Sequence, residues 1–125
     1  MSARILHVRV GERPEAGLAR AAGVMEALEQ GRQPAPYFGI SFADMEPLLA
    51  LLTPRRWALI AVLREGGPMR VAELARRLGR DYKNVHQDVA ALMTWQVLER
   101  DEVGRARVAY DEIVLEVKLP GVQAA

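Results

Sequence analysis

Residues 53–110 decide the fold, and they read TPRRWALIAVLREGGPMRVAELARRLGRDYKNVHQDVAALMTWQVLERDEVGRARVAY. Three amphipathic helical patterns come first in this stretch, and two short strand patterns follow them. A turn at residues 79–81 separates the second helical pattern from the third, and a turn containing glycine joins the two strand patterns. This order predicts three helices followed by a β-hairpin.

The first two helices of this stretch have recognisable boundaries. Thr53 is a favourable N-cap for the first helix, Pro54 suits its first position, and the residues at 66–68 (Gly-Gly-Pro) end it. A short strand at residues 69–71 is expected before a second helix at residues 72–78. The apolar positions expected on these two helices are Trp57, Ile60, Ala61, Leu63, Ala72, Leu74, Ala75 and Leu78.

The third helix follows a turn that needs an unusual backbone conformation. Gly79 supplies the positive φ that such turns commonly need, and Asp81 is expected to cap the helix. The expected inward stripe of the helix is Val85, Val89, Leu92 and Met93. The hairpin strands are expected at residues 97–101 and 105–110. Together these elements predict an α+β fold that contains a winged helix-turn-helix over residues 54–110.

Residues 1–53 are expected to form an extension ahead of this motif. The patterns predict a strand at Ile5–Val10, a helix at 15–30 after Pro14, a strand at 37–42 and a short helix at 45–52. Because these elements have no recognisable chemistry of their own, we expect them to build a dimer interface or to bind a partner.

The C-terminal residues 111–125 contain one more strand pattern and a tail. Within Ile113–Leu119, every second residue is apolar, so one face of the strand is wholly apolar. A two-stranded ribbon is marginal alone, so this strand needs neighbours. We expect it to pair with the strand at Ile5–Val10, either within the chain or across a dimer.

The composition argues against several classes of protein. The 125 residues include no cysteine, which suits a reducing cytoplasm and excludes a thiolate metal site. No apolar run is long enough for a signal peptide or a membrane span. The two histidines, His7 and His86, are far apart, and no glycine-rich phosphate loop is present. We therefore expect a cytoplasmic protein that is not an enzyme and has no cofactor and no metal.

Positive charge is concentrated in the predicted motif. Residues 54–108 hold eleven Arg/Lys and seven Asp/Glu, whereas the whole chain has a net charge of only +1. Phosphate contact requires such a concentration of cations. The excess is modest, so one copy of the motif is expected to bind DNA weakly.

The front of the third helix holds the candidate base-reading side chains, which are Arg80, Tyr82, Lys83, Asn84, His86 and Gln87. Asn and Gln pair bidentately with adenine, and Arg or Lys with guanine, so this set suits direct readout of double-stranded DNA. The alternative is an ordinary solvated helix face. For His86 a hydrogen-bonded boundary position is the favoured alternative, and for Tyr82 packing on the turn is compatible with a phosphate contact.

Further cations are candidates for phosphate contact, namely Arg55, Arg70, Arg105 and Arg107. Arg105 and Arg107 alternate along the second hairpin strand, so they are expected to point to the same side. Ion pairs with nearby acids explain some of these cations equally well. For Arg76 and Arg77 the two explanations are evenly balanced.

The string ELARRLGRDYKNVHQDVAALMTWQVLER at residues 73–100 resembles the MarR-like winged helix-turn-helix regulators, in particular a subgroup of small prokaryotic transcriptional regulators. The resemblance covers roughly the C-terminal half of the chain. It implies that the third helix enters the major groove and that the wing touches the neighbouring backbone. It also implies a regulatory or antitoxin role beside a small toxin. Trp95-Gln96 stands where the pattern usually has Gly, so either a left-handed residue is replaced or the turn is rearranged.

These observations predict a sequence-specific transcriptional regulator that binds DNA as a homodimer and reads a pseudo-palindromic operator. The rival is a protein-interaction module, such as the antitoxin partner of a small protein toxin, for which DNA binding is secondary or absent. The apolar run Leu48–Leu52 and the two strands of residues 1–53 favour the rival.

Overall fold

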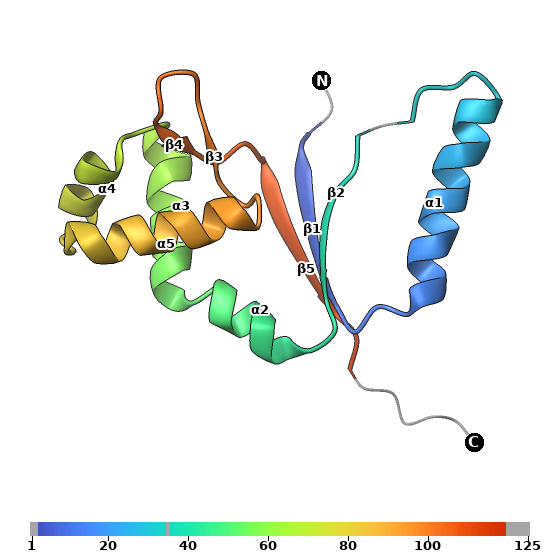
Figure 1. Cartoon of the computed structure of the whole chain (residues 1–125), viewed down its shortest axis with the longest axis horizontal. Coiled ribbons are helices and arrows are strands. Elements are labelled where there is room, and N and C mark those ends of the chain that lie inside the picture. The colour runs from blue at the N-terminus through green and yellow to red at the C-terminus, as the bar shows by residue number, and fades with distance from the viewer. Residues whose placement is uncertain (1–2, 35, 120–125) are drawn as a thin grey trace. The chain divides into compact units, whose positions relative to one another are not determined.

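The computed structural model describes residues 3–34 and 36–119, and it divides them into two compact units (Figure 1). Of the described residues, one unit combines 3–34 and 36–45 with 112–119, and the other is 46–111. The described residues form a mixed α/β fold with five helices, a three-stranded sheet and a two-stranded sheet. This architecture agrees with the expected α+β class.

The first unit is built on a parallel sheet. It contains β1 (Ile5–Val10), α1 (Pro14–Glu29), β2 (Phe38–Phe42) and β5 (Glu112–Val117). The strand order is β2-β1-β5, and β1 is parallel to both neighbours (Figure 1). In this register Leu6 lies opposite Phe38 of β2 and Ile113 of β5. The expected pairing of the C-terminal strand with β1 is therefore confirmed, and it occurs within the chain. The predicted segments 1–53 and 111–125 thus contribute to one unit.

The two faces of the central strand differ in burial. Leu6, Val8 and Val10 are 1–3% exposed, whereas the alternate residues of β1 are only half-buried. α1 is much more exposed than β1, because Ala27 is its one buried residue among those described. Its large apolar side chains are exposed to solvent: Leu18, Met25 and Leu28 are 70%, 59% and 56% exposed.

The second unit contains the helices and the hairpin that residues 53–110 predict (Figure 1). Its elements are α2 (Met45–Leu51), α3 (Pro54–Gly66), α4 (Val71–Leu78), α5 (Tyr82–Thr94), β3 (Glu99–Arg100) and β4 (Ala106–Arg107). Thr53 caps α3 as expected, because its Oγ1 accepts a hydrogen bond from the Arg56 N–H at 3.3 Å. α4 contacts both α3 and α5. The buried side chains of this unit include Leu59, Ile60, Leu63, Leu74, Val85, Val89 and Leu92.

Several sequence predictions for this unit are wrong in detail. In α3 Ile60 and Leu63 are buried as expected, but the third buried residue is Leu59. Ala61 is exposed and Trp57 is half-buried, so these two predicted core positions are wrong. The predicted strand at residues 69–71 is reduced to one bridge between Met69 and Ala106, and Val71 already belongs to α4. The strand cannot extend to Val71 because this residue is already helical: α4 begins directly after Arg70, whose backbone is extended.

The junction between α5 and the hairpin keeps a left-handed residue without using glycine. Gln96 has a φ of 62°, and its carbonyl accepts a hydrogen bond from the Tyr110 hydroxyl at 3.1 Å. The turn is therefore not rearranged, and a residue with a Cβ occupies the strained position.

Replacing Gln96 with valine is expected to lower the free energy of unfolding by roughly 1–2 kcal/mol, because a β-branched side chain tolerates positive φ poorly. Gln96→Gly is the matched control. It is expected to change stability by less than about 1 kcal/mol, since relief of strain is offset by a more flexible unfolded chain. Urea denaturation measures both variants, and equal stability of the two would contradict the constraint.

No helix in the described ranges is long and apolar enough to cross a membrane.

Candidate nucleic-acid interface

The turn between α4 and α5 sets the start of α5. Gly79 has a φ of 63° and ends α4 in the left-handed conformation, as the sequence predicts. Asp81 occupies the N-cap position of α5, but its side chain makes no capping hydrogen bond, so the predicted cap is wrong. The glycine, not a side-chain cap, therefore provides the local signal for this turn.

One side of α5 is buried and the other faces solvent. Val85, Val89 and Leu92 are at most 1% exposed. Helix geometry of about 3.6 residues per turn places Lys83 and Gln87 opposite these three side chains. The exposed residues of this face are Tyr82, Lys83, Asn84, His86, Gln87 and Ala90. The sequence-predicted set on α5 is therefore brought together on one accessible surface.

The flanks of this face have their own geometry. The Tyr82 and His86 rings lie 5.9 Å apart and 35° from parallel, which is the expected contact for residues one helical turn apart. Both remain exposed. Towards the C-terminal end of the face the side chains become small, because Ala90 follows Gln87. Thr94 uses its hydroxyl within the helix, where it donates to the Ala90 carbonyl at 3.0 Å.

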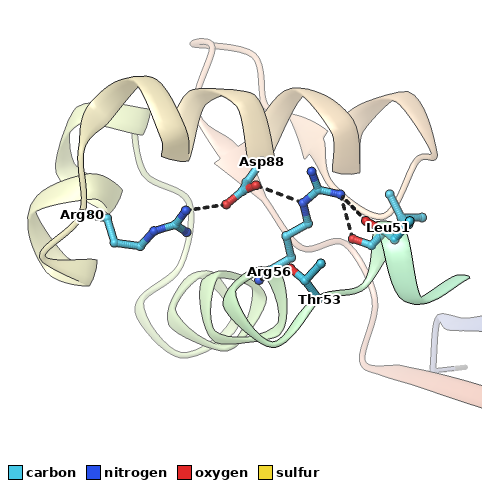
Figure 2. Close-up of polar contacts among 6 residues, drawn as sticks. Leu51, Thr53, Arg56, Arg80 and Asp88 are labelled. Atoms are coloured by element: carbon cyan, nitrogen blue, oxygen red, sulfur yellow. Dashed lines mark hydrogen bonds and ion pairs between the residues drawn. The ribbon is translucent and has the colours of Figure 1, made fainter. Parts of the chain in front are cut away.

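Arg80 does not join this face. Its Nη2 lies 2.8 Å from Asp88 Oδ2, and its side chain is only 18% exposed (Figure 2). Asp88 projects inward from α5 and is 15% exposed. The prediction that Arg80 reads bases is therefore corrected, because its charge is committed to a carboxylate inside the unit.

Asp88 also binds a second arginine (Figure 2). Arg56 Nε donates to Asp88 Oδ1 at 3.0 Å, and Arg56 Nη1 donates to the carbonyls of Ala50 and Leu51 at 3.1 and 3.0 Å. One carboxylate thus connects α5, the turn before it and the start of α3. Through Arg56 it also holds the last carbonyls of α2.

The hairpin is short, and two of its arginines form ion pairs with acidic side chains of the hairpin. β3 and β4 are antiparallel, with Glu99 opposite Arg107 and Arg100 opposite Ala106. Arg107 Nε donates to Glu99 Oε1 at 2.7 Å, and Arg105 Nε donates to Asp101 Oδ2 at 2.7 Å. Ala106 between the two arginines is buried, so both lie on the solvent side as expected, each 45% exposed.

Asp101 organises the hairpin turn. Desolvation raises its pKa, but the stronger combined effect of hydrogen bonds from the Arg105 N–H, the Arg105 side chain and the Val103 N–H lowers the pKa below its ordinary value of 3.8. A lowered pKa stabilises the folded form at pH values above the unfolded pKa. This contribution is therefore present at neutral pH and is lost as the pH falls through the folded pKa, below 3.8.

The ion pairs separate the cations of residues 54–108 into two groups. The paired ones are Arg56, Arg64, Arg77, Arg80, Arg105 and Arg107. Within the part of the chain that the structure describes, the ones without an ion pair are Arg55, Arg70, Arg76, Lys83 and Arg100. All of the second group are exposed, so their charges are available to an external anion. Arg76 and Arg77 differ because Arg77 lies 3.1 Å from Glu73.

Arg70 belongs with the hairpin. Met69 and Ala106 exchange backbone hydrogen bonds of 3.1 and 2.9 Å, which holds the start of α4 beside β4. A Cβ built on Gly104 would lie 3.9 Å from Arg70 Nη1. No hydrogen bond or ion pair joins Arg55 to the α5 face among the described residues. An open hollow of about 390 Å³ lies beside the turn, lined by Ala72, Ala75, Arg76, Gly79, Arg80 and Tyr82.

The family model HVO_A0114 matches residues 51–115, just over half of the 125 residues. The chain belongs to the HVO_A0114 family. The HVO_A0114 region contains α3, α4, α5 and the hairpin, and therefore every residue of the α5 face. It also contains Arg56, Arg80 and Asp88, the three side chains of the Asp88 cluster. No curated protein matches the chain, and no solved structure matches it.

Sequence reasoning missed Asp88 and left Arg76 undecided. Asp88 lies on the same side of α5 as Val85 and Val89, and a carboxylate at an inward position signals a cationic partner. That signal was available from helical spacing. The pairing of Arg77 instead of Arg76 with Glu73 follows the i,i+4 spacing of residues 73 and 77.

Proposed function

We propose that residues 54–110 form a winged helix-turn-helix that binds double-stranded DNA, and that the protein is a sequence-specific transcriptional regulator. The observation that supports this most strongly is the solvent face of α5. Its side chains end in amide, ammonium, imidazole and phenol groups, and they stand on a helix that follows a left-handed glycine turn. The resemblance to MarR-like regulators supports the same function. The proposal includes no catalytic step, metal or cofactor.

In this proposal the N-terminal half of α5 lies in the major groove. Lys83 and Gln87, at the centre of the face, reach base edges, and Asn84 and His86 contact the flanking positions. The small side chain at Ala90 lets the helix approach the groove floor. Tyr82, next to the hollow at the turn, donates its hydroxyl to a phosphate.

The cations without ion pairs are proposed to hold the DNA backbone. Arg70 and Arg100 lie at the hairpin, where Arg100 Nη1 also donates to the Gly104 carbonyl at 3.2 Å. Arg76 lies on α4. Arg105 and Arg107 contact phosphate only if they exchange Asp101 and Glu99 for it, so their contribution is smaller than the sequence predicts.

We further propose that the protein acts as a homodimer. Two α5 helices would then read half-sites about 34 Å apart, and the operator would be pseudo-palindromic.

The test is a titration of the chain against its own upstream DNA at several salt concentrations, with an unrelated duplex as the control. Tight, salt-sensitive binding to the upstream DNA is expected. Arg76→Ala is expected to weaken binding to all sequences and to reduce the salt slope by about one unit, because it removes an available charge. Arg77→Ala is the matched control on the same helix and is expected to change the slope little, since its charge is shared with Glu73. Equal affinity for both duplexes would contradict sequence-specific regulation.

A protein-interaction module is the second candidate, and the exposed stripe of α1 favours it. Three leucines of the run Leu48–Leu52, namely Leu48, Leu51 and Leu52, are 3–5% exposed, and only Leu49, at 59%, offers a large apolar surface, so this run supports the candidate less than the sequence predicts. Leu18, Met25 and Leu28 of α1 do support it, because a large exposed apolar stripe is typical of a binding surface. Co-purification with a small basic protein, lost in a Leu18→Lys/Met25→Lys variant, would favour the antitoxin-type role.

A further inference from the structure

The parallel sheet of the first unit ends in an unusually apolar edge. Among the described residues, β5 has a strand neighbour on one side only, namely β1. Val114, Leu115 and Val117 are 40%, 46% and 40% exposed, and the strand contains no proline. Soluble proteins usually protect such an edge, because its free N–H and C=O groups pair readily with another strand.

The opposite edge of the sheet lacks this character. β2 has polar or small residues at Gly39 and Ser41, and its large side chains Phe38, Ile40 and Phe42 are buried or half-buried. The apolar side chains that still lack cover in this sheet therefore lie on β5.

The backbone of β5 determines which residues are available for pairing. The Glu112 N–H donates to the Arg4 carbonyl at 3.4 Å, and the Lys118 N–H donates to the Val10 carbonyl at 2.9 Å. Successive residues of a strand point their backbone groups to opposite sides. The even-numbered residues therefore face β1, and Ile113, Leu115 and Val117 direct their N–H and C=O groups to the free edge.

Among the three registers that overlap most of β5 with a second, antiparallel β5 at this edge, charge favours the one centred on Leu115 over those centred on Val114 or Glu116. With Leu115 opposite Leu115 of the second copy, Glu112 lies opposite Lys118 and Ile113 lies opposite Val117. Shifting the centre to Val114 brings Glu112 opposite Glu116, and shifting it to Glu116 brings that carboxylate opposite itself. Like charges directly opposite one another destabilise a sheet, whereas opposite charges and apolar pairs stabilise it.

We infer that two copies of this chain dimerise through β5, antiparallel and centred on Leu115, so that two three-stranded sheets become one continuous sheet. The occupant of the edge is a second copy because β5 is complementary to itself in this register. This inference identifies the surface for the proposed homodimer. It does not depend on DNA binding, and its test uses no DNA.

Disulfide cross-linking of single-cysteine variants tests the register of the two β5 strands directly, because the chain has no cysteine of its own. In the full-length chain Leu115→Cys is expected to form a disulfide-linked dimer under mild oxidation, since directly opposite residues lie about 5.5 Å apart. Val114→Cys is the matched control. It lies diagonal to its own copy, about 7–8 Å away, and is expected to cross-link poorly. Preferential cross-linking through residue 114 would overturn the register.

A charge exchange tests the same contact without a covalent bond. Glu112→Lys is expected to raise the dimer dissociation constant about tenfold in sedimentation equilibrium, because lysine then opposes Lys118. Glu112→Lys/Lys118→Glu is expected to associate more tightly than either single variant, while thermal melts check that each variant folds. Tighter association of Glu112→Lys alone, or a monomer at every wild-type concentration, would overturn the inference, and DNA binding by such a monomer would leave the proposed function intact.

Discussion

Asparagine in place of Asp88 is expected to lower the free energy of unfolding by roughly 2–4 kcal/mol, the largest loss from any single polar substitution proposed for the second unit. The carboxylate binds Arg56 at 3.0 Å and Arg80 at 2.8 Å, and all three side chains are less than 20% exposed. The neutral amide leaves two guanidinium groups with little compensation for their lost hydration. Residual exposure of the cluster places the expected loss below that of a fully buried pair.

Glu73→Gln is the matched control for this prediction. It also removes a carboxylate from an arginine pair, but Glu73 and Arg77 are 41% and 51% exposed, so the expected loss is below about 0.5 kcal/mol. Guanidinium denaturation of both variants gives the comparison. If Asp88→Asn lowered the free energy of unfolding no more than Glu73→Gln, the contacts of Asp88 with Arg56 and Arg80 would contribute no more to stability than an exposed ion pair.

The second large effect concerns the α5 face. Gln87→Ala and Asn84→Ala are each expected to lose about 1–3 kcal/mol of discrimination at one base pair of the operator, which is roughly tenfold to a hundredfold in specific affinity. Binding to unrelated DNA should change much less, because neither side chain is charged. Both residues are exposed, so the fold is expected to remain intact.

Thr94→Ala is the control on the same helix. Its hydroxyl is already bonded to the Ala90 carbonyl, and it lies at the last residue of α5. Titrations of a set of operators, each mutated at one base pair, would assign each side chain to its base. Unchanged preferences in both Gln87→Ala and Asn84→Ala would mean that α5 does not read the sequence, and the interaction candidate would then take precedence.

Most of the second unit was predictable because its signals are local. Thr53 with Pro54 starts α3, Gly79 ends α4, and the period of Val85, Val89 and Leu92 gives the buried side of α5. The accessible face of α5 follows from the same periodicity. The hairpin strands expected at residues 97–101 and 105–110 are longer than the observed strands Glu99–Arg100 and Ala106–Arg107. The length of a strand depends on how far its partner stays in register, which the sequence pattern of one strand does not show.

Local signals therefore fix the order of the helices, the buried side of α5 and the residues on its outer face, because helical periodicity and turn residues act over a few positions. Which cations are available depends instead on the contacts that their side chains make in the tertiary structure. Arg80 and Arg76 are both arginines near the same turn, but Asp88 holds one inside the unit, whereas the other is exposed. The tertiary structure also decides that the expected pairing of β5 with β1 is parallel and occurs within the chain, and that β5 has a strand neighbour on one side only among the described residues. The direction of a pairing and the choice between a partner in the same chain and one in a second copy depend on contacts between distant segments, which no local pattern encodes.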